Sequence, residues 1–243
     1  MSVQVIDRPS PNFDARNGVP IDILLMHYTG MQSAEAAMGR LTDPEAKVSA
    51  HYTVDEDGTI YAHVEESERA WHAGQSSWAG ETDINARSIG IEIVNPGHEF
   101  GYRDFPGEQI AAVITLARDI FTRHPLIVPR RVLGHSDVAP ARKQDPGERF
   151  PWAHLAAQGV GLWPVDARRP HRPILKEGAQ GAAVATLQKK LAAFGYGVPQ
   201  SGIYDSATAL VVTAFQRHFR PEAVTGMTDG ETVGRLNRLL QLV

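Results

Sequence analysis

The sequence contains no cysteine, and this absence removes several kinds of chemistry at once. Disulfide bonds, a cysteine nucleophile and thiolate metal ligands are all excluded, so any zinc must be held by histidine and carboxylate side chains. A chain without cysteine fits a reducing and an oxidising compartment equally well. This feature therefore does not localise the protein.

The chain also lacks an excess of positive charge and a long apolar run. Its 243 residues carry 24 Lys and Arg against 28 Asp and Glu, which excludes the basic surface typical of nucleic-acid-binding proteins. No run approaches the roughly 18 apolar residues of a membrane span. Residues 1–9 do not show the basic and apolar segments of a secretory signal. We therefore expect a cytoplasmic protein without a membrane span or a nucleic-acid partner, the alternative location being the periplasm or cell envelope.

The N-terminal part alternates predicted strands with predicted helices. Short runs typical of strands lie at residues 21–27, 50–55, 59–64, 88–94 and 132–133. Asp57-Gly58 separates the second run from the third, as in a β-hairpin. Ser33 is placed to cap a helix that ends near Leu41, and residues 109–123 show the apolar spacing of an amphipathic helix. This alternation predicts an α/β domain with a mixed central β-sheet flanked by helices.

The composition changes in the C-terminal part. Residues 165–173 are rich in proline and arginine and have no periodicity, which indicates a linker. Three amphipathic helices are predicted beyond it, and a G-x-x-D-x-x-T pattern that begins at Gly202 and again at Gly226 places an aspartate to cap each of the last two. We therefore predict a catalytic domain at 1–164 and a small three-helix domain at 174–243, which contains no catalytic cluster.

The ten histidines differ in their sequence context. His27 and His135 each follow an apolar strand, at the carboxyl edge where sites form in open α/β sheets. His51 shares the tripeptide His-Tyr-Thr with His27 but begins a strand, so position favours His27 as a ligand while spacing alone does not decide. His63 alternates with apolar residues and is predicted to be structural. Five others are predicted to be solvated: His98, His124, His154, His171 and His218.

Glu92 is the one charged residue in the apolar run 88–94. Burying an unpaired carboxylate costs several kcal/mol, so its presence needs an explanation. One interpretation is an edge strand with Glu92 facing water. The other is a carboxylate near a metal-bound water, with its pKa shifted so that it can act as a general base.

One loop places an imidazole, an ammonium and a carboxylate close together, on His135, Lys143 and Asp145. The alternative is a polar surface loop. Two imidazoles, one carboxylate and an open position form a catalytic zinc set, in which zinc lowers the pKa of bound water to about 7 and polarises a carbonyl. Glu92 would then move the proton of the water, and Lys143 would face the oxyanion of the tetrahedral intermediate. Together these residues form a complete set for hydrolysis.

Seven motifs occur in order within residues 9–152. They are Ser10-Pro11-Asn12-Phe13-Asp14, His27-Tyr28-Thr29, Ser49-Ala50-His51-Tyr52, Ala70-Trp71-His72-Ala73-Gly74, Ser88-Ile89-Gly90-Ile91-Glu92, Gly134-His135-Ser136-Asp137-Val138-Ala139-Pro140, and Lys143-Gln144-Asp145-Pro146-Gly147 with Phe150-Pro151-Trp152. This stretch resembles the type 2 family of zinc-dependent N-acetylmuramoyl-L-alanine amidases, which share the peptidoglycan-recognition-protein fold. Residues 174–240 resemble the three-helix peptidoglycan-binding domain, through residues 175–181 and 202–205.

The resemblance implies zinc on His27, His135 and Asp145, with Glu92 as catalytic base and acid and Lys143 stabilising the oxyanion. The implied reaction is hydrolysis of the amide between the lactyl group of N-acetylmuramic acid and L-Ala of the stem peptide. Four residues are expected to bind substrate: Trp71, His72, Asn85 and His51. The expected partners are peptidoglycan fragments or muropeptides, in the 1,6-anhydro form if the enzyme is cytoplasmic, and we expect a monomer.

Two other functions stay open on the sequence alone. A non-catalytic peptidoglycan-recognition or binding protein would be expected to lack a ligand such as Asp145, which is present here. A zinc peptidase would use the same residues to cut within the stem peptide. The products distinguish these functions, because an amidase releases the free peptide and a peptidase leaves a shortened muropeptide.

Overall fold

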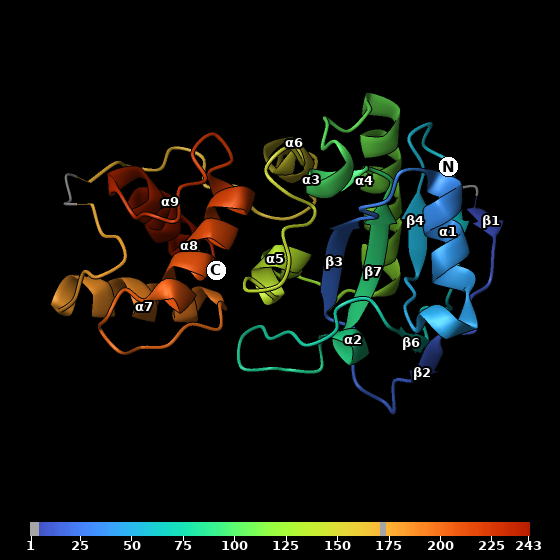
Figure 1. Ribbon diagram of the computed structural model, residues 1–243, viewed down its shortest axis with the longest axis horizontal. Helices are drawn as coiled ribbons and strands as arrows, with labels where there is room; N and C mark the ends of the chain where they lie inside the picture. The colour runs from blue at the N-terminus through green and yellow to red at the C-terminus, as the bar shows by residue number, and fades with distance from the viewer. Residues whose placement is uncertain (1–4, 171–173) are drawn as a thin grey trace.

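The computed structural model describes residues 5–170 and 174–243, in which an N-terminal α/β part lies beside a C-terminal group of helices (Figure 1). His171 and the end of the predicted linker lie outside the described residues. Among the residues that are described, no helix is long and apolar enough to cross a membrane.

A six-stranded mixed sheet forms the centre of the N-terminal part, in the order β1-β5-β4-β7-β3-β8. Its strands are β1 (Val5–Asp7), β3 (Ile23–Tyr28), β4 (Tyr52–Val54), β5 (Ile60–Ala62), β7 (Ser88–Ile93) and β8 (Val132–Gly134). β4 and β5 pair antiparallel across the predicted Asp-Gly turn, and the other neighbours run parallel. A separate antiparallel pair joins β2 (Phe13–Ala15) to β6 (Glu68–Ala70). The predicted fold class is confirmed.

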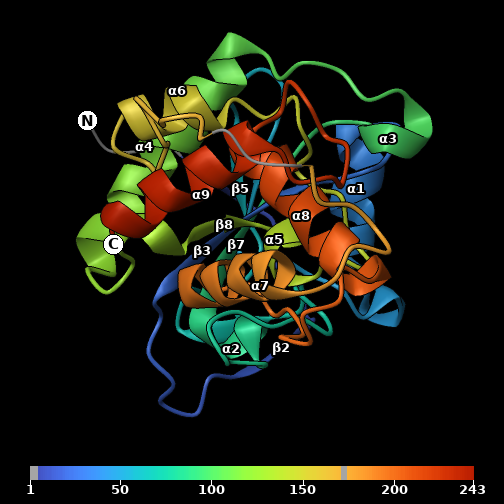
Figure 2. The ribbon, with the colours of Figure 1, turned by 90° about the vertical axis from the view of Figure 1, so that its left-hand side faces the viewer.

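Helices cover both faces of this sheet (Figures 1 and 2). α1 (Ala34–Thr42) lies on one face and α4 (Gly107–Arg123) on the other. Ser33 caps α1 as predicted, since its side chain accepts a hydrogen bond from the backbone N–H of Ala36. Shorter helical segments complete the N-terminal part: η1 (Pro44–Ala46), α2 (Ile84–Arg87), α3 (Gly97–Phe100), η2 (Pro129–Arg131), α5 (His135–Val138) and α6 (Trp152–Ala157).

The alternation of side chains along β7 separates the core from the site. Ile89, Ile91 and Ile93 are fully buried in one hydrophobic cluster with α4. Because successive residues of a strand point to opposite faces, Glu92 is directed to the face away from α4. β7 lies between β4 and β3. The interpretation of Glu92 as a water-facing residue of an edge strand is therefore wrong, because strand order is not encoded in the local apolar pattern.

The C-terminal part contains the three predicted helices, α7 (Ala182–Phe194), α8 (Ser206–Phe219) and α9 (Gly230–Gln241). The aspartates of the two repeated motifs cap α8 and α9 as predicted. Asp205 accepts a hydrogen bond from the backbone N–H of Thr208 at 2.8 Å, and Asp229 accepts one from Thr232 at 3.0 Å.

The two parts share one buried hydrophobic cluster. Trp78, Leu133 and Val138 of the N-terminal part belong to it together with Phe194 and Phe215 of the C-terminal helices. The ring of Trp78 packs edge-on against that of Phe194, with centroids 5.9 Å apart. The C-terminal helices therefore lie against the N-terminal part near β8 and α5, as Figures 1 and 2 show.

Candidate active site and metal centre

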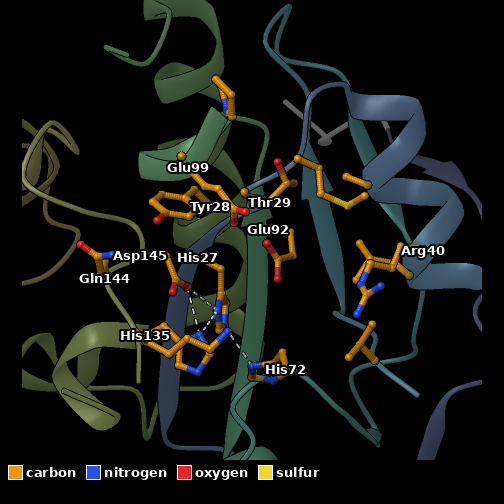
Figure 3. A pocket seen from close by; sticks show the side chains of 18 of the residues that line it. His27, Tyr28, Thr29, Arg40, His72, Glu92, Glu99, His135, Gln144 and Asp145 are labelled. Carbon is orange, nitrogen blue, oxygen red and sulfur yellow. Dashed lines mark hydrogen bonds and ion pairs between the residues drawn. The ribbon is translucent and has the colours of Figure 1, made fainter. Parts of the chain in front are cut away.

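Two histidines and one aspartate meet where β3 and β8 end (Figure 3). His27 lies near the end of β3, His135 follows β8 directly, and Asp145 comes from the loop beyond. The Nδ1 atoms of His27 and His135 are 2.9 Å apart, and each lies 3.0 Å from Oδ2 of Asp145. All three residues are buried. The structure thus brings together the three expected metal ligands.

The chemistry of this group fits a divalent metal. Its three ligand atoms lie within 4.8 Å of one another, and two imidazole nitrogens with one carboxylate oxygen are a donor set of catalytic zinc. Nε2 of His135 is 3.0 Å from the carbonyl oxygen of Ala73. Because a carbonyl oxygen only accepts, Nε2 carries the proton, and the lone pair of Nδ1 is left for a metal.

The protonation states of His27 and Asp145 also favour the binding of a metal cation. Burial lowers the pKa of His27 to about 4, so this imidazole is neutral at pH 7. Burial opposes the ionisation of Asp145, but the charges and hydrogen bonds of His135 and His27 outweigh it and hold the pKa of Asp145 well below its ordinary value. A neutral imidazole and an ionised carboxylate are the forms that bind a metal.

His72 contacts the ring nitrogen of His27 that does not face the other two ligands. Its Nδ1 lies 3.1 Å from Nε2 of His27, and its Nε2 lies 3.4 Å from Oγ of Ser88. Such a partner fixes the tautomer and the ring orientation of a metal ligand. Gly90 makes room for the ring, because a Cβ at this position would lie 2.6 Å from it. His72 is expected from the sequence to bind substrate. It lines the pocket, and it also contacts His27, one of the three proposed metal ligands.

Glu92 is a half-buried residue that lines the same pocket. Its Oε2 has no hydrogen-bond partner in the described part of the chain. Burial raises the pKa of Glu92 to about 8, and the charge of Asp145 acts in the same direction while Lys143 opposes it. A carboxyl group with this pKa can both accept and release a proton near neutral pH.

A single pocket of about 400 Å³ contains the metal-binding group, Glu92 and Lys143. This volume is within the range of roughly 300–1,000 Å³ that is usual for small-molecule sites. The wall continues past Trp71, one of the expected substrate-binding residues, to Arg40 of α1. Figure 3 shows Arg40 across the pocket from His135. Arg40 could not be recognised from the sequence, because nothing in the pattern of α1 distinguishes it from an ordinary exposed helix residue.

Two residues expected to bind substrate, His51 and Asn85, are not among those that line this pocket. His51 is fully buried. Its Nδ1 accepts a hydrogen bond from the backbone of β7, and its Nε2 is 3.2 Å from the carbonyl oxygen of Glu68. The side-chain oxygen of Asn85 accepts hydrogen bonds from the backbone N–H groups of residues 72–73. These hydrogen bonds fix the backbone around the site.

Among the remaining histidines, His218 differs most from its prediction as a solvated residue. It is 2% exposed, and its Nδ1 is 2.6 Å from a carboxylate oxygen of Asp137. His98 and His124 are half-buried and lie beside glutamates, whereas His154 is exposed as predicted. His63 is structural as predicted, since it is buried and bonded to Thr53 and to backbone.

Comparison with known proteins gives two family matches. Residues 17–148 match the sequence model of the family described as N-acetylmuramoyl-L-alanine amidase. Residues 180–236 match the one described as "Putative peptidoglycan binding domain". The chain is 38% identical over 241 residues to N-acetylmuramoyl-L-alanine amidase AmiD of Escherichia coli (strain K12), covering 91% of this chain and 83% of that protein.

Two solved structures resemble the whole fold. One is the complex of AmiD from Escherichia coli with anhydro-N-acetylmuramic acid-L-Ala-D-gamma-Glu-L-Lys, with a TM-score of 0.79 and 36% identity, covering 97% of this chain and 93% of that chain. The other is AMPDH3 from Pseudomonas aeruginosa in complex with an anhydromuramic pentapeptide, with a TM-score of 0.80 and 33% identity, covering 97% and 95%.

Proposed function

The chain belongs to the N-acetylmuramoyl-L-alanine amidase family, and we propose that it is a zinc hydrolase that cleaves the amide between N-acetylmuramic acid and L-alanine of peptidoglycan stem peptides. The observation that carries this proposal is a single pocket that contains a His-His-Asp group and Glu92, whose Oε2 has no hydrogen-bond partner among the described residues. The two similar structures contain anhydro-muramyl peptides, which supports the 1,6-anhydro form as the substrate.

The residues of the pocket have distinct roles in this reaction. His27, His135 and Asp145 would hold the zinc ion, which as a Lewis acid would polarise the scissile carbonyl and acidify water. Glu92 accepts a proton from the attacking water and delivers it to the nitrogen of the leaving L-alanine. Its burial favours the protonated form that this delivery requires. His72 holds the ring of His27 in the orientation that exposes Nδ1.

Lys143 is placed to stabilise the negative charge that develops on the carbonyl oxygen. It lies on the same loop as Asp145 and lines the pocket, and its backbone N–H is fixed by a hydrogen bond to the carbonyl oxygen of Ala139 at 3.0 Å. A cation directed at the oxyanion stabilises the transition state more than the ground state. This difference, rather than tighter substrate binding, is the contribution we assign to Lys143.

The C-terminal part belongs to the same proposal. We assign residues 1–164 to the catalytic domain, 165–173 to a linker and 174–243 to a domain that binds the same polymer, which the family match at 180–236 supports. We propose that the protein acts in the cytoplasm as a monomer on released muropeptides. Cell fractionation and sedimentation test these points, and recovery from the periplasm or as a dimer would contradict them.

Digestion of two substrates side by side tests the reaction. Purified protein loaded with zinc is incubated with anhydro-muropeptides and with intact sacculi, and the products are identified by mass spectrometry. We expect free stem peptides, released faster from the anhydro-muropeptides. Shortened muropeptides would instead identify a peptidase, and binding without any product would identify a recognition protein.

Metal dependence is tested in the same assay. Removal of the metal with a chelator should abolish hydrolysis, and added zinc should restore it. Asp145→Ala removes one metal ligand. Loss of a residue that only hydrogen-bonds a ligand typically weakens metal binding roughly 10–100-fold, so we expect a larger effect for Asp145→Ala. Protein that contains no zinc, and stays inert when zinc is added, would rule out the proposal.

A further inference from the structure

Asp137 joins the metal-binding segment to the C-terminal helices. Asp137 is 1% exposed, and its side chain accepts three hydrogen bonds. Oδ2 accepts from the backbone N–H of Gly134 at 2.8 Å and from Nδ1 of His218 at 2.6 Å, and Oδ1 accepts from the hydroxyl of Tyr196 at 2.6 Å. Two of its three donors therefore come from the C-terminal part of the chain.

The position of Asp137 is coupled to that of the ligands. Gly134, whose backbone N–H donates to Asp137, directly precedes His135. Asp137 itself lies in the same short helix as His135. Within that helix the backbone N–H of Ser136 donates to the carbonyl oxygen of Asp145 at 2.9 Å. A displacement of Asp137 would therefore move both His135 and Asp145.

Helix α8 also contacts the far end of this loop. A guanidinium nitrogen of Arg217 donates to Oε1 of Gln144 at 3.0 Å, next to Asp145. The adjacent His218 is stacked on the ring of Trp152, with centroids 3.7 Å apart and planes inclined by 21°. Two consecutive residues of α8 thus contact both ends of the segment that carries two metal ligands.

Tyr196 is fixed as firmly as His218. It is 2% exposed, and its ring packs edge-on against Trp78 of the N-terminal part, with centroids 4.9 Å apart. Burial raises the pKa of Tyr196 well above its ordinary value, and the charge of Asp137 adds to this effect. The phenol therefore stays protonated and remains a donor to Asp137.

We propose that Tyr196 and His218, acting through Asp137, are positioning residues for the metal site. The C-terminal part is then a structural component of the catalytic site in addition to any role in binding the polymer. This inference rests on the proposed function, because it takes zinc to be bound by His27, His135 and Asp145. A C-terminal part that served only as a tether would leave zinc binding unchanged when these two contacts are removed.

Four substitutions in the full-length protein separate the hydrogen bonds from packing. Tyr196→Phe removes one donor and keeps the ring. His218→Phe removes the other donor and keeps a ring in the stack, whereas His218→Asn keeps an N–H near the position of Nδ1 and loses the ring. Tyr204→Phe is the matched control, since Tyr204 is fully buried and its hydroxyl donates within the C-terminal part, to the carbonyl oxygen of Gly226 at 2.7 Å.

The measurement is the zinc dissociation constant, obtained by competition with a chelator, together with the visible absorption spectrum of the cobalt(II)-substituted protein. We expect Tyr196→Phe and His218→Phe to weaken zinc binding about tenfold, the lower end of the effect of partners outside the ligand shell, and to alter the cobalt spectrum. His218→Asn and Tyr204→Phe should retain the wild-type affinity and spectrum. Thermal unfolding of the metal-free proteins shows which variants are folded.

The outcomes distinguish this inference from the proposed function. Wild-type protein that binds no zinc would overturn the proposed function. Wild-type protein that binds zinc, with Tyr196→Phe and His218→Phe binding it as tightly as Tyr204→Phe does, would overturn only the positioning role. If Tyr196→Phe does not fold, the comparison of His218→Phe with His218→Asn decides: equal affinities overturn the role, and weaker binding by His218→Phe alone supports it.

Discussion

His27 and Glu92 are direct partners in the register of the parallel strands β3 and β7. Paired residues of neighbouring strands point to the same face of a sheet, so backbone pairing alone places the proposed ligand beside the proposed base. Both strands are interior in the sheet. The spacing between this ligand and the base is therefore set by interior strands, whereas His135 comes from the short helix α5, and Lys143 and Asp145 come from the loop that follows it.

Replacing Glu92 with glutamine should abolish most of the activity and leave the metal in place. The amide has nearly the same shape but cannot accept the proton, and general acid–base catalysis typically contributes about 10²–10⁴-fold to a rate. We expect kcat to fall by that factor with unchanged zinc content. Steady-state kinetics and elemental analysis of the same preparation check both. An active Glu92→Gln enzyme would contradict the assignment of Glu92 as the base.

The same substitution should change how stability depends on pH in the metal-free protein. The pKa of Glu92 is raised from 4.5 to about 8 in the folded state, so the folded protein holds a proton that the unfolded chain has lost between these values. The contribution to the free energy of unfolding is full below pH 4.5 and is lost as the pH rises to about 8.

Glutamine does not titrate, so the stability of Glu92→Gln relative to wild type should increase across this pH window. Urea denaturation of both metal-free proteins at a series of pH values measures the difference. Other titrating groups, among them His27, are present in both proteins and cancel in the comparison. A stability difference that is constant with pH would show that Glu92 titrates normally.

Removing the charge of Lys143 should lower kcat far more than it raises KM. Loss of one oxyanion-stabilising group costs about 10²–10³-fold in kcat, and we expect this for Lys143→Met, with normal zinc content. Lys189→Met is the control, because Lys189 is exposed on α7. An effect of Lys143→Met confined to KM would instead assign this side chain to substrate binding.

A methyl group on Gly90 should weaken zinc binding without touching a ligand. Its Cβ would lie 2.6 Å from the ring of His72, so His72 must move away from Nε2 of His27. We expect Gly90→Ala to raise the zinc dissociation constant roughly 10–100-fold, as loss of such a partner does. Gly39→Ala is the control, since nothing lies within 4 Å of its added Cβ, and it should bind zinc normally.

Local sequence signals predict most of the helices and strands, and they mark His27 and His135 as candidate ligands. The Asp57-Gly58 turn, the Ser33 cap and the apolar spacing of α4 act within a few residues, and the structure confirms each of them. His27 and His135 could be recognised because each ends an apolar run. The convergence of these histidines with Asp145 follows from the parallel pairing of β3 with β8.

Relationships between distant segments could not be predicted in this way. The contact between Asp137 and His218 spans 81 residues. Nothing in the apolar pattern of α8 distinguishes His218 from a solvated histidine. His51 shows the same limit, because its tripeptide matches that of His27, yet His51 lies just before β4 and is fully buried. Strand order and helix docking determine these environments, and neither leaves a local pattern.

The buried cluster that joins Trp78 and Val138 to the C-terminal helices has a consequence for the thermodynamics of unfolding. Domains that meet through small polar interfaces melt independently, whereas parts that share a hydrophobic core lose it together. We therefore expect a single calorimetric transition for the whole chain. The two domains assigned from the sequence would then be one cooperative unit, in which a destabilising change in either part lowers the melting temperature of both.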